Sequence, residues 1–415
     1  MRRLTIVAFL TAFIAINFAD KAVFGLAAAP IMRDLRLNHA QFGAIGSSFF
    51  LLFSFSALLI GWLGDRLNPN WLLAGMALVW TAAQLPAAGA VSVATLVGLR
   101  VMLGAGEGPA FPVALQVAYV DLPDSQRPRI TGIILAGAPL GTAAAALFCT
   151  WLMLRYGWHV AFVTLGVVSF AWAMLWLAVA PRLAPSASTP AAKEKIEPVL
   201  SMRALLTNRT MLGVMLASFA AYWASAVAVI WFPKFLERGA GWSEATAGVL
   251  LALAWGMQIP ICILGGWTAE ALQRRTRVRG AAYRRLAILG VALTGASFLG
   301  LAFVRAQSLA ATFVILSLMA VVVVFVVAGP IVAEIVPRAQ RGTALGALVA
   351  VYALAGFIGP FAFGAIVDRS AAAVSGYQAA FLAAGTGIVA AAGCALYLIR
   401  PALDRARLLG AEIPA

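Results

Sequence analysis

Two pairs of ionisable residues lie inside apolar stretches of this sequence. Asp20 and Lys21 are adjacent within the run 4–30, and Arg100 and Glu107 lie within the run 92–120. A charged side chain in hydrocarbon costs roughly 3 kcal/mol on insertion scales, so such residues usually face the interior of a helix bundle and mark a functional site. These residues are the strongest functional signal in the chain.

Arg100 and Glu107 are seven residues apart, so both project from one face of a helix. A guanidinium stays charged at any working pH and can grip a carboxylate with two hydrogen bonds, which makes Arg100 a candidate anchor for an organic anion. A buried glutamate gains or loses a proton according to the balance between desolvation and nearby cations, which suits Glu107 to proton coupling. The alternative is a structural ion pair between these two residues.

Asp20 and Lys21 are neighbours, so their side chains diverge by about 100° on a helix and need not pair with each other. Both are therefore candidate functional residues. Asn17 lies one turn before Lys21 and is placed to hydrogen-bond a ligand. The alternative is one tight ion pair that neutralises Asp20 and Lys21.

The composition indicates a membrane protein. Of its 415 residues, 63% are hydrophobic and 11% are charged, whereas soluble domains carry about 25% charged residues. Apolar runs of about 20 residues span a bilayer as helices. Twelve such runs occur, roughly at 5–30, 40–63, 70–89, 92–119, 130–153, 160–180, 211–235, 245–268, 285–304, 309–335, 343–366 and 377–400.

The twelve runs fall into two halves. The polar, proline-rich segment 181–209 separates six runs from six and is predicted to be a cytoplasmic linker with a short helix near 200–206. A pattern Gly-Trp-x-x-acid-x-Leu recurs at 61–67 and 266–272, at equivalent places in the two halves. The predicted fold is therefore an all-α membrane protein with twelve transmembrane helices in two pseudo-symmetric six-helix bundles, 1–180 and 210–415.

Several glycines lie four residues apart within the predicted spans. This spacing lets helix backbones approach closely in lipid. The pairs are Gly104 with Gly108, Gly137 with Gly141, and Gly342 with Gly346.

The net charge of +15 reports topology rather than nucleic-acid binding. If residue 1 is cytoplasmic, most of the 30 lysines and arginines fall in cytoplasmic segments. This skew is the positive-inside pattern, and it predicts that both termini are cytoplasmic. We expect an inner (plasma) membrane protein of a bacterium that binds membrane lipid and no nucleic acid.

The sequence offers no catalytic or cofactor motif. Cys149, Cys262 and Cys394 fall in separate spans without metal or disulfide spacing. His39 and His159 lie far apart in predicted outer loops, and no phosphate-binding loop occurs. We expect no enzyme activity, no metal and no cofactor.

Five segments carry a family resemblance. The segment 61–66, Gly-Trp-Leu-Gly-Asp-Arg, resembles the loop 2–3 signature of the major facilitator superfamily. Segments 16–21, 100–112, 156–162 and 230–236 resemble motifs of its anion:cation symporter group, which takes up sugar acids and other organic anions. The likeness extends over nearly the whole chain.

The resemblance implies a secondary active transporter that imports a small organic anion by alternating access, coupled to protons, with sodium as the alternative ion. Arg100 and Lys21 would hold the substrate carboxylate, while Glu107 and Asp20 would carry protons. Further candidates that could line the cavity are Asn17, Tyr222, Gln258 and Tyr352. We expect the monomer to be the functional form.

The segment that includes Gly61, Asp65 and Arg66 is expected to act as a gate. Asp65 can meet the N-terminus of a helix in the other half, where backbone N–H groups favour an anion, and Arg66 can pair with an acid there. The alternative is a plain turn capped by Asp65.

The sequence also departs from the symporter pattern. Phe18 replaces a tyrosine, and Lys21 replaces an arginine whose planar fork would bind a carboxylate at two points. The segment 137–141, Gly-Ala-Pro-Leu-Gly, leans toward a motif of drug exporters, so a proton antiporter that exports drugs or metabolites is the alternative function. A second alternative function, from a different functional class, is a membrane sensor that binds a ligand without transporting it.

Overall fold

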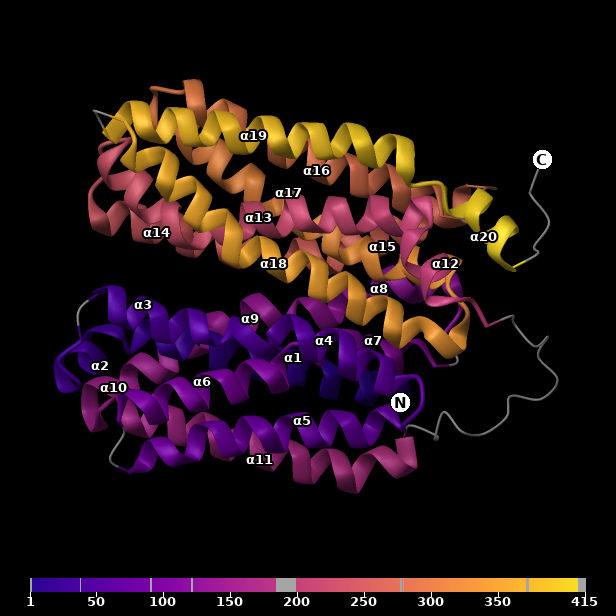
Figure 1. The fold of residues 1–415 in the computed structure, drawn as a ribbon, viewed down its shortest axis with the longest axis horizontal. Coiled ribbons are helices and arrows are strands. Elements are labelled where there is room, and N and C mark those ends of the chain that lie inside the picture. The colour runs from indigo at the N-terminus through magenta and orange to yellow at the C-terminus, as the bar shows by residue number, and fades with distance from the viewer. Residues whose placement is uncertain are drawn as a thin grey trace. The chain divides into compact units, whose positions relative to one another are not determined.

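The structure is a computed structural model that describes residues 2–37, 39–89, 92–120, 122–183, 199–276, 278, 280–370 and 373–409. Within these ranges every regular element is a helix (Figure 1). Ten helical segments of the described chain are long and apolar enough to cross a membrane. The predicted all-α membrane fold is confirmed.

The chain divides into two compact units. Unit 1 comprises Met1–Leu122, Ile133–Glu197 and Ala339–Ala350. The helices that begin in its first two segments are α1 (Arg2–Leu26), α2 (Ala28–Asp34), α3 (His39–Ser48), α4 (Phe50–Gly64), α5 (Pro69–Gln84), η1 (Leu85–Ala88), α6 (Val93–Glu107), α7 (Ala110–Tyr119), α9 (Gly137–Ala144), the π-helical turn η3 (Ala145–Cys149), α10 (Thr150–Tyr156) and α11 (Trp158–Leu183).

Unit 2 comprises Pro123–Gly132, Pro198–Arg338 and Val351–Ala415. The helices that begin in its long middle and last segments are α12 (Met202–Thr207), α13 (Arg209–Arg238), α14 (Glu244–Gly256), α15 (Gln258–Arg275), α16 (Ala281–Phe303), α17 (Gln307–Ile335), α19 (Ala373–Leu398) and α20 (Pro401–Leu409). Two short 3-10 turns, η2 (Asp124–Gln126) and η4 (Arg338–Gln340), precede helices that run from one unit into the other. These helices are α8 (Arg127–Leu135) and α18 (Arg341–Asp368).

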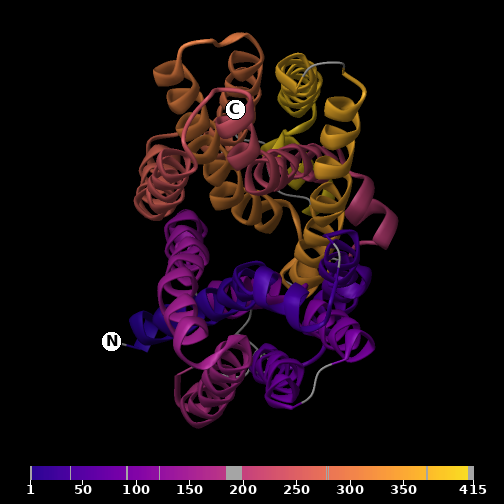
Figure 2. The same ribbon diagram turned by 90° about the vertical axis from the view of Figure 1, so that its left-hand side faces the viewer.

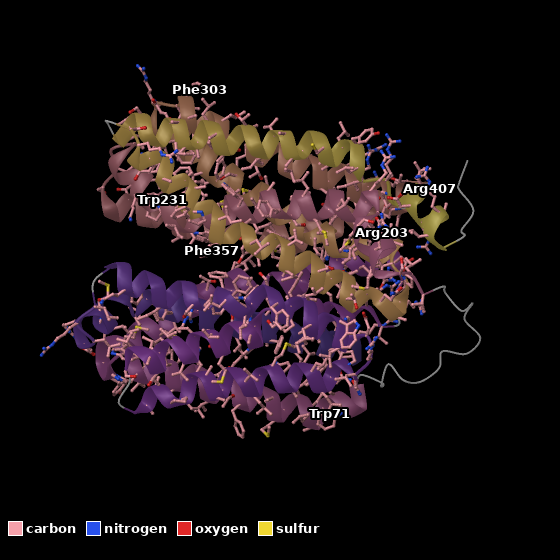
Figure 3. The ribbon with its side chains drawn as sticks, in the orientation of Figure 1. Trp71, Arg203, Trp231, Phe303, Phe357 and Arg407 are labelled. Carbon is pink, nitrogen blue, oxygen red and sulfur yellow. The ribbon has the colours of Figure 1, made fainter. Side chains whose placement is uncertain are left out.

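Within each unit the long helices run roughly side by side, as the end-on view of Figure 2 shows. The predicted linker 181–209 contains α12, close to the short helix expected there, and its residues 184–198 lie outside the described ranges. In unit 2, Arg203 on α12 and Arg407 on α20 lie at one end, and Phe303 lies at the opposite end (Figure 3).

Two of the twelve predicted spans do not form a helical segment long enough to cross a membrane. The run 40–63 is divided at Phe49 into α3 and α4, and the run 92–119 is divided at Gly108 and Pro109 into α6 and α7. Proline lacks a backbone N–H and clashes with the preceding turn, which accounts for the second break. These two breaks reduce the number of long continuous spans among the described residues to ten.

The paired glycines make the closest helix contacts in unit 1. A Cβ on Gly104 or Gly108 would collide with the carbonyl oxygen of Phe49 or Phe53, respectively. The two other pairs repeat this arrangement. Gly137 and Gly141 of α9 pack on the carbonyls of Thr11 and Ala15, and Gly342 and Gly346 of α18 pack on those of Gly61 and Ala57. In each case two glycines four apart meet two carbonyls four apart, so the packing expected from the sequence is confirmed.

A single methyl group tests this contact. Gly104→Ala places a Cβ against the Phe49 carbonyl, so we expect it to destabilise the protein by about 1–3 kcal/mol through overpacking. The measurement is the thermal unfolding midpoint of the purified protein in detergent. Gly98→Ala, on the same helix, is the matched control because nothing lies within 4 Å of its added Cβ. Equal midpoints for the two variants would contradict the packing.

Candidate functional site

The four ionisable residues singled out by the sequence lie together in unit 1. Asp20 and Lys21 are on α1, and Arg100 and Glu107 are on α6. Asp20, Glu107 and Arg100 are buried, with exposed fractions of 0%, 1% and 6%. The Lys21 side chain is 25% exposed, so it is the member of the group that reaches outward.

Lys21 joins the two helices. Its ammonium donates to Asn17 Oδ1 at 2.6 Å and lies 3.2 Å from Glu107 Oε2. It also lies 4.4 Å from the centre of the Phe18 ring. The pairs Arg100–Glu107 and Asp20–Lys21, which the sequence left as structural alternatives, do not form among the described residues. The ion pair instead runs from α1 to α6.

Arg100 is held by aromatic rings rather than by a carboxylate. Its guanidinium carbon lies 4.4 Å from the centre of the Phe24 ring and 4.9 Å from that of Phe49. Cation–π contacts of this kind stabilise a desolvated cation. The Nε and Nη1 atoms of Arg100 are buried without a hydrogen-bond partner. A buried charged donor that lacks an acceptor is costly, and an anionic ligand would supply one.

The break between α3 and α4 helps to position this cation. Phe49 lies at the turn between the helices, where its carbonyl packs on Gly104 of α6. This close approach brings the Phe49 ring over Arg100, one turn earlier on α6. The interruption of the predicted span is therefore part of the site.

Asp20 has a partner that the sequence reasoning missed. Gln84, the last residue of α5, donates its side-chain amide to Asp20 Oδ1 at 2.7 Å, and both residues are buried. The other carboxylate oxygen, Oδ2, is buried without a hydrogen bond. The sequence did contain a signal for this contact. Gln84 is a glutamine inside the apolar run 70–89, and a buried polar side chain needs a hydrogen-bond partner.

The expected gate residues lie at the C-terminus of α4. Asp65 accepts hydrogen bonds from the backbone N–H groups of Gly342 and Thr343, both at 2.7 Å, and from the Thr343 hydroxyl at 2.6 Å. The carboxylate thus lies at the first turn of α18, where the helix dipole favours an anion. Burial raises the pKa of the Asp65 carboxyl, and these hydrogen bonds act in the opposite direction.

Gly61 and Arg66 complete this region. The Gly61 carbonyl accepts from Gln116 Nε2 at 3.5 Å and packs against Gly342. The Arg66 guanidinium lies 3.7 Å from the centre of the Trp62 ring. It forms no ion pair with an acid among the described residues, in contrast to the expected pairing.

The remaining candidate residues lie in unit 2. The rings of Tyr222 and Tyr352 are 5.1 Å apart, and each contacts Phe325. Gln258 donates to the backbone carbonyl of Leu318 at 3.2 Å. Its amide donor is therefore engaged by the protein itself.

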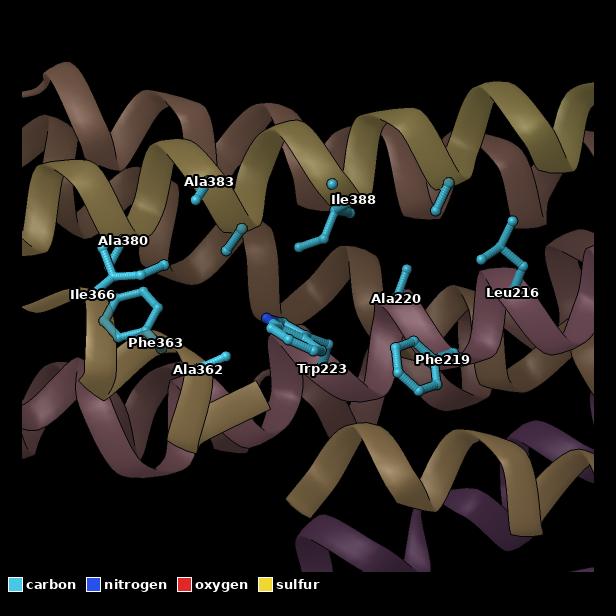
Figure 4. Close-up of a pocket in the computed structure, with 13 residues that line it drawn as sticks. Leu216, Phe219, Ala220, Trp223, Ala362, Phe363, Ile366, Ala380, Ala383 and Ile388 are labelled. Atoms are coloured by element: carbon cyan, nitrogen blue, oxygen red, sulfur yellow. The ribbon is translucent and has the colours of Figure 1, made fainter. Parts of the chain in front are cut away.

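Unit 2 also contains an apolar cavity of about 410 Å³ between α13, α18 and α19 (Figure 4). Its lining includes Leu216, Phe219, Phe363 and Ile388, and Trp223 contributes an indole N–H without a hydrogen-bond partner. No charged side chain lines it, so it does not suit an organic anion. Among the described residues, no group of three metal-binding side chains occurs.

A second polar cluster lies near the C-terminus of α17, around Glu334. Glu334 is buried and pairs with Arg405 of α20 at 3.0 Å. Arg405 also lies 4.0 Å from Asp124, which pairs with the buried Arg127. The C-terminal helix thus supplies a partner that sequence spacing did not indicate.

The sequence profile described as Major Facilitator Superfamily matches residues 9–283. The chain is 26% identical to a hexuronate transporter of Bacillus subtilis over 99% of this chain and 98% of the relative. It is 25% identical to a D-galactonate transporter of Escherichia coli strain CFT073, over 63% of this chain and 66% of the relative.

Two solved structures share the fold. The proton:xylose symporter XylE superposes with a TM-score of 0.73 at 17% identity, over 96% of each chain. A bacterial homologue of the human lysosomal transporter Spinster, in an inward-facing conformation, superposes with a TM-score of 0.65 at 19% identity, over 97% of this chain and 98% of that chain.

The Asp65 contact yields a direct test. Asp65→Ala removes the acceptor for two backbone N–H groups, so we expect the amides of Gly342 and Thr343 to exchange hydrogen about tenfold faster. The measurement is hydrogen–deuterium exchange of peptides covering 339–346. Asp65→Asn keeps one acceptor oxygen and is expected to show a smaller increase. Unchanged exchange in Asp65→Ala would show that the contact does not form in solution.

Proposed function

The chain belongs to the Major Facilitator Superfamily, and from this premise we propose that it imports a small organic anion of the sugar-acid class. It is an integral membrane transporter and not an enzyme. Relatives that match it are named as transporters of hexuronate, D-galactonate and galactarate or D-glucarate. These names support the substrate class proposed for this chain.

The observation that carries the proposal is the state of Arg100. It is a buried guanidinium with two aromatic contacts and two N–H-bearing nitrogens that lack an acceptor. A substrate carboxylate satisfies these donors in a medium of low dielectric constant, where the interaction is strong. Arg100 is therefore proposed as the main anchor of the substrate.

Lys21 is proposed as a second, switchable contact. It is shared between Asn17 and Glu107 and is partly exposed. Protonation of Glu107 removes the negative charge that holds the ammonium, so Lys21 becomes available to the substrate carboxylate. Loading of the proton and of the anion then favour each other, which is the coupling a symporter needs.

The remaining steps follow the same logic. Asp20 is the second proton site, and Tyr222, Gln258 and Tyr352 are proposed to contact the non-carboxylate part of the substrate. The Asp65 contact with α18 is proposed to hold a gate closed during alternating access. Sodium is the alternative coupling ion.

The distribution of basic residues supports an inner-membrane location with both termini in the cytoplasm. The exporter alternative was based on the segment 137–141. Gly137 and Gly141 pack against the backbone of α1, so these glycines serve helix packing, and no contact of this segment favours export. We keep import as the proposed direction and the monomer as the proposed functional form.

Replacement of the anchor tests the substrate assignment. Arg100→Lys keeps the charge but loses the planar guanidinium that can form two hydrogen bonds with a carboxylate. We therefore expect the KM for a hexuronate, measured as uptake into proteoliposomes, to rise at least about tenfold. Arg305→Lys, at an exposed position between α16 and α17, is the matched control. An unchanged KM in Arg100→Lys would remove Arg100 from the site.

Replacement of Glu107 tests the coupling. Glu107→Gln mimics the protonated state permanently, so we expect substrate counterflow to persist while uptake driven by a pH gradient is lost. Both rates are measured on the same proteoliposomes, and counterflow is the internal control for folding. Full concentrative uptake by Glu107→Gln under a pH gradient would overturn the role given to Glu107.

A further inference from the structure

Asp20 lies away from the space that Lys21 reaches. It is fully buried, whereas the neighbouring Lys21 is partly exposed. The Asp20 carboxylate is directed to the end of α5, where Gln84 donates to Oδ1 at 2.7 Å. In the proposed function, the substrate carboxylate meets Lys21, and Asp20 takes up a proton without touching the substrate.

The position of Gln84 is fixed by its own helix. Thr81, one turn earlier on α5, donates to the carbonyl of Gly166 on α11 at 3.2 Å. A Cβ on Gly166 would lie 3.1 Å from the Cβ of Gln84, so the two helices are in close contact at this point. The chain then leaves α5 for the turn η1, which contains Pro86. This arrangement holds the Gln84 amide against α1.

The charged and titratable groups around Asp20 come from several elements. Lys21 on α1 and Arg100 and Glu107 on α6 interact with it electrostatically, and Cys149 of η3 lies on another side. Gln84 provides the hydrogen bond from α5. Of these groups, the amide of Gln84 is neutral at every working pH and also carries both a donor and an acceptor.

We propose that Gln84 is a positioning residue that partners Asp20 in both of its protonation states. When Asp20 is ionised, the Gln84 NH₂ group donates to Oδ1, as in this structure. When Asp20 carries a proton, a rotation of the amide by 180° presents the carbonyl oxygen, which accepts the hydrogen bond of the acid. The buried carboxyl of Asp20 thus keeps one hydrogen-bond partner in both protonation states, so neither state loses this hydrogen bond.

This inference rests on the proposed function for its link to transport, but its central test needs no substrate. Four full-length proteins are compared: the wild type, Asp20→Asn, Gln84→Met and the double variant. The readout is the thermal unfolding midpoint of the purified protein between pH 5 and 8. Thr294→Val is the control, because it removes the hydrogen bond of a buried threonine to the Gly290 carbonyl on α16 of unit 2 and leaves unit 1 unchanged.

Gln84→Met removes the hydrogen-bond partner from both protonation states of Asp20, and the loss is larger for the ionised carboxylate because hydrogen bonds to charged groups are stronger. We therefore expect the pH dependence of the unfolding midpoint to move to higher pH by about one unit in this variant. This shift corresponds to a tenfold change in the proton affinity of Asp20. In the Asp20→Asn background the same substitution is expected to cause no pH-dependent change, because it acts only through Asp20. Thr294→Val is expected to lower the midpoint equally at every pH, because its hydrogen bond involves no titratable group.

If Gln84→Met changes the unfolding midpoint by the same amount at every pH, and does so in the Asp20→Asn background too, the inference is overturned and Gln84 is a packing residue. If Gln84→Met does not fold, Gln84→Asn replaces it, since its amide is one methylene too short for the contact. Hexuronate counterflow against pH is then measured on the same variants. If the four proteins show no transport while their unfolding midpoints vary with pH as expected, the result counts against the proposed function and not against the Gln84–Asp20 pair.

Discussion

The burial of charge within one bundle is the constraint on which the site depends. Asp20, Lys21, Arg100 and Glu107 carry formal charges that sum to zero, and each is withdrawn from water at least in part. In a medium of low dielectric constant a net charge is expensive, whereas a neutral set can persist. A monovalent anion that joins the set leaves it one unit negative, and a single proton restores neutrality. For the import proposed above, electroneutrality thus gives a local reason for coupling to a cation, without a long-range conformational signal.

The fold positions these charges through interruptions and close approaches. The turn at Phe49 places an aromatic ring over Arg100, and Gly104 allows the backbone of that turn to approach α6. At the other edge of the site, α5 ends at Gln84 and presents its amide to α1. The helices around the site are therefore broken or terminated where a side chain must be aimed.

Much of the fold could be predicted from the sequence, because hydropathy alone determines which segments enter lipid. Ten of the predicted spans occur as long helical segments in the described residues. The division at Phe49 could not be predicted, since no proline marks it and the Phe49 carbonyl packs on Gly104, which is distant in the chain. Glycine spacing, in contrast, was a reliable guide, because close backbone packing in lipid has few other solutions.

The candidate site was predicted less completely. Periodicity placed Arg100 and Glu107 on one face of a helix, but it carried no information on α1, whose Lys21 is the actual partner of Glu107. Gln84 and Asp20 are 64 residues apart in the chain, and their contact depends on the packing of α5. The buried Glu334 is a similar case, since its partner Arg405 belongs to a helix beyond the last predicted span. Partner choice between helices is a tertiary property that a single sequence does not encode locally.

The paired glycines have a consequence for how this sequence can diverge. An added Cβ on any of them would meet a carbonyl oxygen of the neighbouring main chain, although Gly108, Gly137 and Gly342 also lie near side chains. A larger residue at such a position cannot be offset by a smaller one across the contact, because every amino acid has the same carbonyl. These sites should therefore tolerate no compensatory exchange, and drift among related chains should be confined to the rest of each helix surface.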